Sequence, residues 1–378
     1  MIARILLVAS DVFVRRLTPA LASFVRMQAD FRILDIGRSP GDLRREIRTL
    51  NPRGLIIEAL PKRTEMLVGL GLPTVIADSD TLFPGAVSMD VNDESVGAEA
   101  ARFFIDSGYT HFGCVRNATP YSDQRFGGFE AAVAGRFETF SAFQQVGRMR
   151  PYMETWNEDT EALTRWLKQL PKPVAVFAVH DPLGRLVCEA AVAAGLHVPE
   201  EVAVVGANND ELVCGLSYPP LSSVIIPWDR IGNLAGDWVL RLIAGEEAPG
   251  KALMVEPGPV NPRQSTTLVA VDDPDLRRVV QFMREHFSES IGIGEMCDRL
   301  RISRRAVERK CSLHLHTTPW DVLCRMRVDA AREHLASTER AMGDIAERCG
   351  FSNAEQFSVL FRRFTGQTPS GYRKSSRG

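Results

Sequence analysis

Paired cysteines are absent from this sequence. The seven cysteines lie at positions 114, 188, 214, 297, 311, 324 and 349, and no two of them have the CxxC spacing of a zinc site or a redox pair. Their odd number argues against a disulfide framework and for reduced thiols. We therefore expect a cytoplasmic protein with no metal site and no cofactor.

Long apolar runs and catalytic signatures are missing as well. No stretch of about 20 apolar residues spans a membrane, and the short apolar run at residues 5–9 indicates a first strand rather than a secretion signal. The sequence contains no GxSxG, Walker or HExxH pattern and no GxGxxG after a strand, and its seven histidines form no cluster. We expect neither an enzyme nor a membrane partner.

Charge is unevenly distributed along the 378 residues, a length that suits two or three domains. Residues 273–378 carry 19 Lys and Arg against 14 Asp and Glu, a net of +5, whereas the remainder has a net of −7. A basic end on an acidic body is typical of a nucleic-acid-binding module attached to another domain. Taken alone, this difference is equally compatible with an ordinary solvated surface.

Short apolar runs alternate with helical patterns through the first part of the chain. The predicted strands are residues 5–9, 31–36, 55–58, 74–77, 87–89, 112–115, 174–179 and 202–205. Nearly continuous apolar strands separated by helices indicate parallel sheets covered on both faces. The number of units predicts an α/β fold of two doubly wound lobes, which we expect to meet near Gly108 and again near Ile226.

Polar residues follow several of these strands, where doubly wound sheets bind their ligands. Asp11, Asp78 and Asn208 each come after a strand, and the pair His180-Asp181 follows another. Arg125 begins a helix of the second lobe. A salt bridge within one lobe or a helix cap is the alternative for each, and Phe13 and Trp228 nearby are more typical of a core.

Several segments of this part resemble the sugar-binding core of LacI/GalR-type regulators and periplasmic pentose-binding proteins. They are residues 89–92 (MDVN), 108–113 (GYTHFG), 125–129 (RFGGF), 198–209 (VPEEVAVVGANN) and 219–224 (PPLSSV). The resemblance covers about residues 2–267 and implies that Arg125 and Asp181 contact a monosaccharide, with Asp11, His180 and Asn208 as further candidates. Members usually have an acid at the position of Asn208. The DNA-binding headpiece of this class does not precede the first strand, so we expect DNA to be bound at the other end.

Two helices joined by a tight turn are predicted near the end of the chain. Residues 342–349 have one apolar face, Gly350 suits a left-handed C-cap, and Asn353 suits the N-cap of the next helix with Gln356 at the capping-box position. By spacing alone, a helix-turn-helix and an ordinary αα-hairpin fit equally well.

The residues of this region resemble those of AraC-type transcriptional regulators. The shared residues are Ile345, Ala346, Cys349, Gly350, Phe351, Phe357, Phe361, Phe364, Gly366, Thr368, Pro369, Tyr372 and Arg373. The family has two helix-turn-helix units, which implies units at about 293–313 and 342–364 and a linking helix at about 319–337. The domains are then an N-terminal sensor over 1–269 and an all-α DNA-binding domain over 270–378, an order that resembles xylose-operon regulators.

The resemblance implies double-stranded DNA as a partner of the exposed helix faces. The candidate contacts are Ser303, Arg304, Arg305, Glu308 and Arg309 in the first unit and Asn353, Glu355 and Gln356 in the second. Arginine can bind guanine in the major groove and glutamate can accept from cytosine. Asn353, Gln356, Arg362 and Arg363 better suit phosphate contacts or caps, and a solvated helix face is the alternative for each residue.

These features predict a sugar-responsive transcriptional regulator. A monosaccharide, a pentose and xylose by resemblance, binds in the cleft of the core and changes how the C-terminal module binds DNA. A homodimer is expected, and RNA polymerase is a further candidate partner. The alternatives are a solute-binding protein of a transporter, which the basic C-terminal module disfavours, and an enzyme, for which the sequence supplies no nucleophile–base pair.

Overall fold

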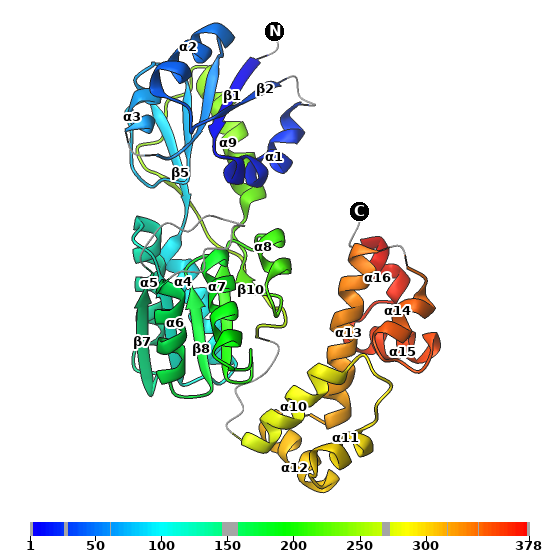
Figure 1. The fold of residues 1–378 in the computed structure, drawn as a ribbon. Helices are drawn as coiled ribbons and strands as arrows, with labels where there is room; N and C mark the ends of the chain where they lie inside the picture. Colours follow the sequence, from blue (N-terminus) through cyan, green and yellow to red (C-terminus); the bar gives the residue numbers. More distant parts are fainter. Residues whose placement is uncertain are drawn as a thin grey trace.

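The computed structural model describes residues 3–25, 29–60, 62–145, 158–266, 273–315, 317–338 and 340–375. Two lobes, each built on a six-stranded sheet, are followed by a run of helices (Figure 1). The predicted fold class is confirmed. The expected domain boundary at 269/270 lies outside the described residues.

The first lobe is an all-parallel sheet with strand order β11-β5-β4-β3-β1-β2. Its strands are β1 (Ala3–Ala9), β2 (Ala29–Asp35), β3 (Gly54–Glu58), β4 (Thr74–Ala77), β5 (Ala86–Val91) and β11 (Leu253–Val255). Its helices are α1 (Asp11–Val25), α2 (Pro40–Leu50), α3 (Arg63–Val68) and α9 (Trp228–Ile243). Successive residues of β1 alternate between two cores: Ile5 packs on the side of α1 and α9, and Leu6 on the side of α2 and α3. Both faces of the sheet are therefore covered.

The second lobe repeats this design with strand order β12-β10-β9-β8-β6-β7. Its strands are β6 (His111–Arg116), β7 (Thr139–Gln144), β8 (Val174–Ala178), β9 (Val202–Ala207), β10 (Ser222–Val224) and β12 (Val260–Asn261), the last antiparallel to β10. Its helices are α4 (Asp93–Asp106), α5 (Pro120–Val133), α6 (Glu158–Gln169), α7 (Asp181–Ala193) and α8 (Glu211–Leu216).

The chain passes from one lobe to the other three times. It crosses at Asn92, between β5 and α4, again at residues 225–227, between β10 and α9, and again at 256–259, between β11 and β12. The expected boundary near Gly108 is wrong, because α4 does not cover the sheet that precedes it but packs on α5 of the second lobe. Asn92 also joins two crossings, since its amide donates to Glu256 at 2.9 Å.

Two glycines explain why α4 belongs to the second lobe. A Cβ atom on Gly97 would lie 1.9 Å from the carbonyl oxygen of Arg125, and one on Gly128 would lie 2.0 Å from that of Glu94. Only glycine therefore allows α4 and α5 to cross at this distance. This close crossing brings the start of α4 beside Arg125.

The C-terminal part consists of α10 (Pro274–His286), α11 (Ile293–Leu300), α12 (Arg304–Leu315), α13 (Pro319–Ser337), α14 (Met342–Arg348), α15 (Ala354–Thr365) and α16 (Pro369–Ser375). Helices α11–α12 and α14–α15 are two helix-turn-helix units, and α13 runs between them (Figure 1). The turns use different residues in the left-handed region, Arg301 with φ of 55° and Gly350 with φ of 75°. Arg327 connects α13 to the segment between α10 and α11, because its guanidinium donates to the carbonyl oxygens of Phe287, Glu289 and Ile291.

No helix among the residues with a described structure is long and apolar enough to cross a membrane.

Candidate functional site

Arg125 is the best-connected of the predicted ligand residues. It lies in the first turns of α5 with 5% of its surface exposed. Its Nε donates to Asp93 Oδ1 at 2.7 Å, and its Nη1 donates to the carbonyl oxygen of Val179 at 2.7 Å and to Asn208 Oδ1 at 3.5 Å. The guanidinium also lies 5.0 Å from the ring centre of Tyr121. Arg125 thus joins the ends of three elements, α4, β8 and β9.

His180 lies beside this group as the N-cap of α7. Its Nδ1 accepts from the backbone N–H of Leu183 at 3.1 Å, and its Nε2 lies 3.1 Å from the side-chain amide of Asn117. Burial, together with the positive charges of Arg125 and Arg16, lowers the pKa of His180 to about 3. The ring is therefore neutral.

Asp181 faces the interior of the second lobe. It is fully buried, its Oδ1 accepts from the Ser223 hydroxyl at 2.5 Å, and its Oδ2 accepts from the backbone N–H of Asp210 at 2.7 Å. Burial raises the pKa of Asp181 to about 7, which these two hydrogen bonds partly oppose. The carboxyl group holds the loop after β9, where Asn208 and Asn209 both adopt positive φ.

The first lobe contributes a group of carboxylates. Glu58 ends β3 and accepts from the backbone N–H of Ser10 at 2.6 Å, while Asp78 follows β4 and Asp90 lies near the end of β5. Enclosure by protein and the charge of Asp93 raise the pKa of both Asp78 and Asp90, although the side chain of Asp78 still reaches solvent. Enclosure likewise raises the pKa of Asp93, against the attraction of Arg125.

Arg16 of α1 is a positively charged residue of the first lobe that lies near these groups. It lies close enough to lower the pKa of His180 and Asp181 in the second lobe. Its guanidinium stands 4.9 Å from the ring centre of Trp228, which packs edge-on against Phe13 at 5.6 Å. The indole N–H of Trp228 is buried and has no hydrogen-bond partner among the described residues.

We call this set the inter-lobe cluster: Arg16, Glu58, Asp78, Asp90, Asp93, Asn117, Arg125, His180, Asn208 and Trp228. Four of the residues singled out from the sequence meet in it: Asp78, Arg125, His180 and Asn208. Asp11 is exposed at the start of α1, and Asp181 is turned inward. Glu58 and Asn117 were missed by the sequence analysis, although both stand at strand ends and the rule that found Asp78 also finds them. Nothing in the local sequence distinguishes Arg16.

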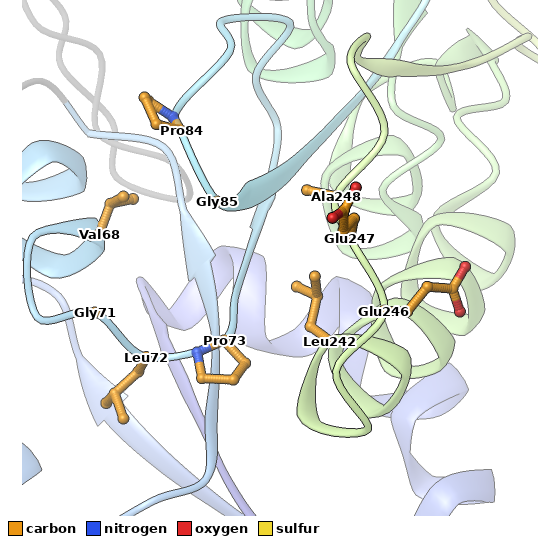
Figure 2. A pocket seen from close by; sticks show the side chains of 10 residues that line it. All are labelled: Val68, Gly71, Leu72, Pro73, Pro84, Gly85, Leu242, Glu246, Glu247 and Ala248. Carbon is orange, nitrogen blue, oxygen red and sulfur yellow. The ribbon is translucent and has the colours of Figure 1, made fainter.

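A surface pocket of about 510 Å³ lies elsewhere on the first lobe. Its lining includes Leu72 and Pro73 before β4, Gly85 before β5, Leu242 near the end of α9, and Glu246, Glu247 and Ala248 after that helix (Figure 2). These segments are at the amino ends of the strands, opposite the edge that carries the inter-lobe cluster. The carboxylate of Glu246 is already paired with Arg241. This pocket is therefore a poor candidate for binding a polar ligand.

In the first helix-turn-helix unit, α12 exposes the predicted basic face. Ser303 accepts from the N–H of Ala306 at 3.3 Å, so its hydroxyl caps the helix. Arg304 and Glu308 pair with each other at 2.8 Å. Arg305 and Arg309 are exposed, and no hydrogen bond or ion pair links them to another described residue. These two guanidinium groups are the donors most readily available to DNA.

In the second unit, the polar residues at the start of α15 are occupied by capping. Asn353 Oδ1 accepts from the N–H of Gln356 at 2.7 Å. Gln356 Oε1 in turn accepts from the N–H of Ser352 at 3.0 Å, one residue before the position expected for a capping box. Glu355 is exposed, and Arg363 pairs with Asp321 of α13 at 3.1 Å. The interpretation of Asn353 and Gln356 as caps agrees with these contacts.

Helix α10 contacts both parts of the chain. Arg284 donates to the carbonyl oxygen of Val198 at 2.6 Å and pairs with Glu200 at 3.1 Å, both in the second lobe. At the other end of the helix, Lys310 of α12 binds Asp273 at 2.6 Å and Asp275 at 2.9 Å. One helix therefore links the second lobe to the first recognition helix.

All seven cysteines are buried, and the part of the chain with described structure contains no group of three or more His, Cys, Asp or Glu residues arranged to hold a metal ion.

Comparisons with known proteins agree with this division of the chain. A family described as periplasmic binding protein-like domain matches residues 101–266, and one described as helix-turn-helix domain matches residues 296–375. The xylose operon regulatory protein of Haemophilus influenzae is 28% identical over 222 residues, which is 59% of this chain and 57% of that protein. The match thus spans little more than half of that relative.

Solved structures share the fold. A structure of the xylose-binding transcription activator xylR has a TM-score of 0.78 at 22% identity, covering 100% of this chain and 99% of the other. A periplasmic binding protein/LacI transcriptional regulator from Alkaliphilus metalliredigens, complexed with D-xylulofuranose, has a TM-score of 0.57 at 14% identity and covers 70% of this chain and 99% of the other. The chain therefore contains a region similar to periplasmic binding protein-like domains and a region similar to helix-turn-helix domains, and over part of its length it is similar to a xylose operon regulatory protein.

Proposed function

We propose that this protein is a sugar-responsive transcriptional regulator. The observation that carries the proposal is the inter-lobe cluster, which lies in the same chain as two helix-turn-helix units. Sensing and DNA binding then belong to separate domains, about residues 1–269 and 270–378.

The chemistry of the inter-lobe cluster suits a neutral polyol. A sugar hydroxyl donates one hydrogen bond and accepts others, and the cluster supplies acceptors in its carboxyl groups and donors in Arg16, Arg125 and the unpaired Trp228 N–H. The contacts proposed for the ligand are Arg125, His180 and Asn208, with Asp11 at the exposed start of α1. Asp181 acts indirectly, by holding the loop that presents Asn208. Names of the relatives that mention xylose and D-xylulofuranose support a pentose, and xylose first.

On the DNA side, the proposed contacts are Arg305 and Arg309, with Ser303, Arg304, Glu308, Asn353, Glu355 and Gln356 nearby. The two recognition helices then enter successive major grooves of double-stranded DNA. A homodimer in the cytoplasm without catalytic activity or cofactor, acting with or against RNA polymerase, completes the proposal. Sugar binding then regulates DNA binding if a change in the conformation of the second lobe is transmitted through α10 to α12.

Thermal denaturation against a panel of monosaccharides tests the sensor. A sugar present at about 100 times its dissociation constant stabilises the domain that binds it by about 2.7 kcal/mol. Xylose is expected to raise the melting temperature. If no pentose or hexose shifts it, the assignment of the inter-lobe cluster as a sugar site is wrong. Export of the protein from the cell would favour the solute-binding alternative.

A further inference from the structure

Val359 of α15 has an apolar side chain that does not pack into the core of the protein. It is 63% exposed, whereas Phe357, Leu360 and Phe361 of the same helix are at most 9% exposed and Phe364 is partly buried. At 100° per residue, Val359 shares the exposed face with Glu355 and Arg362. A single exposed valine is common on protein surfaces, so the argument rests on where this one lies.

The two recognition helices are both twelve residues long, and their exposed faces differ. Counted from the first residue of each helix, Val359 corresponds to Arg309, and Glu355 corresponds to Arg305. The first two turns of α15 therefore expose no cation, while the same turns of α12 expose three arginines, of which Arg304 is paired with Glu308. The hydroxyl of Ser358 is also engaged, donating to the carbonyl oxygen of Ala354 at 2.9 Å.

The residues in the first turns of a recognition helix are those that meet base edges in the major groove. Only thymine presents a methyl group there, and apolar side chains contact it. We propose that Val359 reads the 5-methyl group of a thymine, so that α15 recognises its half of the site by apolar contact while α12 uses arginine. This inference rests on the proposed DNA-binding function.

The test uses full-length protein. Duplexes that it binds are first selected from a randomised library, and each thymine of the selected site is then replaced singly by deoxyuridine, which removes only the methyl group. Burial of one methyl group is worth about 0.8 kcal/mol, so wild-type affinity should fall about three- to fivefold at one thymine. Val359→Ala should bind the thymine and uracil duplexes equally at that position. Ser358→Ala, a change at the neighbouring exposed residue, should keep the wild-type preference.

The outcomes separate the two claims. If the library yields no enriched sequence, the DNA-binding function fails, and the reading by Val359 fails with it. If a site is enriched but no thymine depends on its methyl group, or if the dependence persists in Val359→Ala, only the role of Val359 is overturned. Because Val359 is exposed, the melting temperature of the variant should match that of the wild type.

Discussion

Arg284 and Glu200 form the ion pair that joins α10 to the second lobe. Their side chains are 19% and 4% exposed, and Nη2 of Arg284 lies 3.1 Å from Oε1 of Glu200. Burial raises the pKa of Glu200, and the charge of Arg284 opposes that rise. Removing one partner leaves the other charged group buried without its counter-charge, and this strongly destabilises the contact between α10 and the second lobe.

Glu200→Gln should therefore uncouple the two parts of the protein. Typical coupling between two ligands is about 1–3 kcal/mol, or about 5–150-fold in affinity, and it acts equally in both directions. In the variant, sugar should change operator affinity much less than in the wild type, while sugar still binds. Titration of operator with and without saturating sugar measures this ratio.

Glu285→Gln is the matched control, because Glu285 is an exposed carboxylate next to Arg284 on the same helix. It should retain the full response. A wild-type response in Glu200→Gln would show that the signal does not pass through this contact.

Arg125→Ala should lower both sugar affinity and stability. The Arg125–Asp93 pair is almost completely buried, at 6% and 3% side-chain exposure, and breaking such a pair typically costs about 3–5 kcal/mol. The double variant Arg125→Met with Asp93→Asn removes both charges and should recover much of the stability. Urea unfolding measures the first effect and sugar-induced thermal shift the second. If the double variant recovers sugar binding as well as stability, Arg125 is a structural residue and not a ligand contact.

Asp181 should make the sensor less stable as the pH rises from about 4 to about 7. Its pKa is raised in the folded protein to about 7, so the folded state binds the proton more tightly than the unfolded chain does. The resulting stabilisation is complete below the unfolded pKa and is lost as the pH passes through the folded pKa. Each unit of difference corresponds to about 1.4 kcal/mol.

Asp181→Asn mimics the protonated form, since its amide oxygen can accept from the Asp210 N–H and its amide nitrogen can donate to Ser223. The variant should be stable, and its stability should fall less between pH 4 and pH 7. Urea titrations at both pH values measure the difference. Equal slopes in variant and wild type would contradict the raised pKa of Asp181.

Much of the fold follows from periodicity. The eight predicted strands correspond to strands of the structure, and in most of them the apolar residues are buried on both faces of the sheet; the edge strand β2 differs, since Ile33 is 53% exposed. Strands β10, β11 and β12 were not predicted, since they have only three, three and two residues and their pairing depends on distant partners. Strand β7 was also missed, because its side chains are only partly buried and its apolar pattern is weak.

The site was harder to predict than the fold, for a physical reason. Asn208 and His180 both follow strands, and this position predicts that they lie close together, as they do beside Arg125. The position does not show which way a side chain turns, and Asp181 turns inward because Ser223 and the Asp210 N–H satisfy its carboxylate. The lobe crossing at Asn92 depends on the close approach of Gly97 to the backbone of Arg125 and of Gly128 to the backbone of Glu94, which no local pattern reveals.

Arg305 and Arg362 should affect DNA binding in different ways. Arg305 lies near the start of α12 without a partner among the described residues, whereas Arg362 lies toward the end of α15. Arg305→Ala should cost about 1–3 kcal/mol at the selected site and relax base preference at one position. Arg362→Ala should weaken all sequences alike and reduce the salt dependence of binding, because a phosphate contact acts through counterion release. Affinities for selected and random duplexes at several salt concentrations distinguish the two effects. If Arg305→Ala weakens selected and random DNA equally, Arg305 contacts phosphate, and base reading by the first unit depends on Arg309.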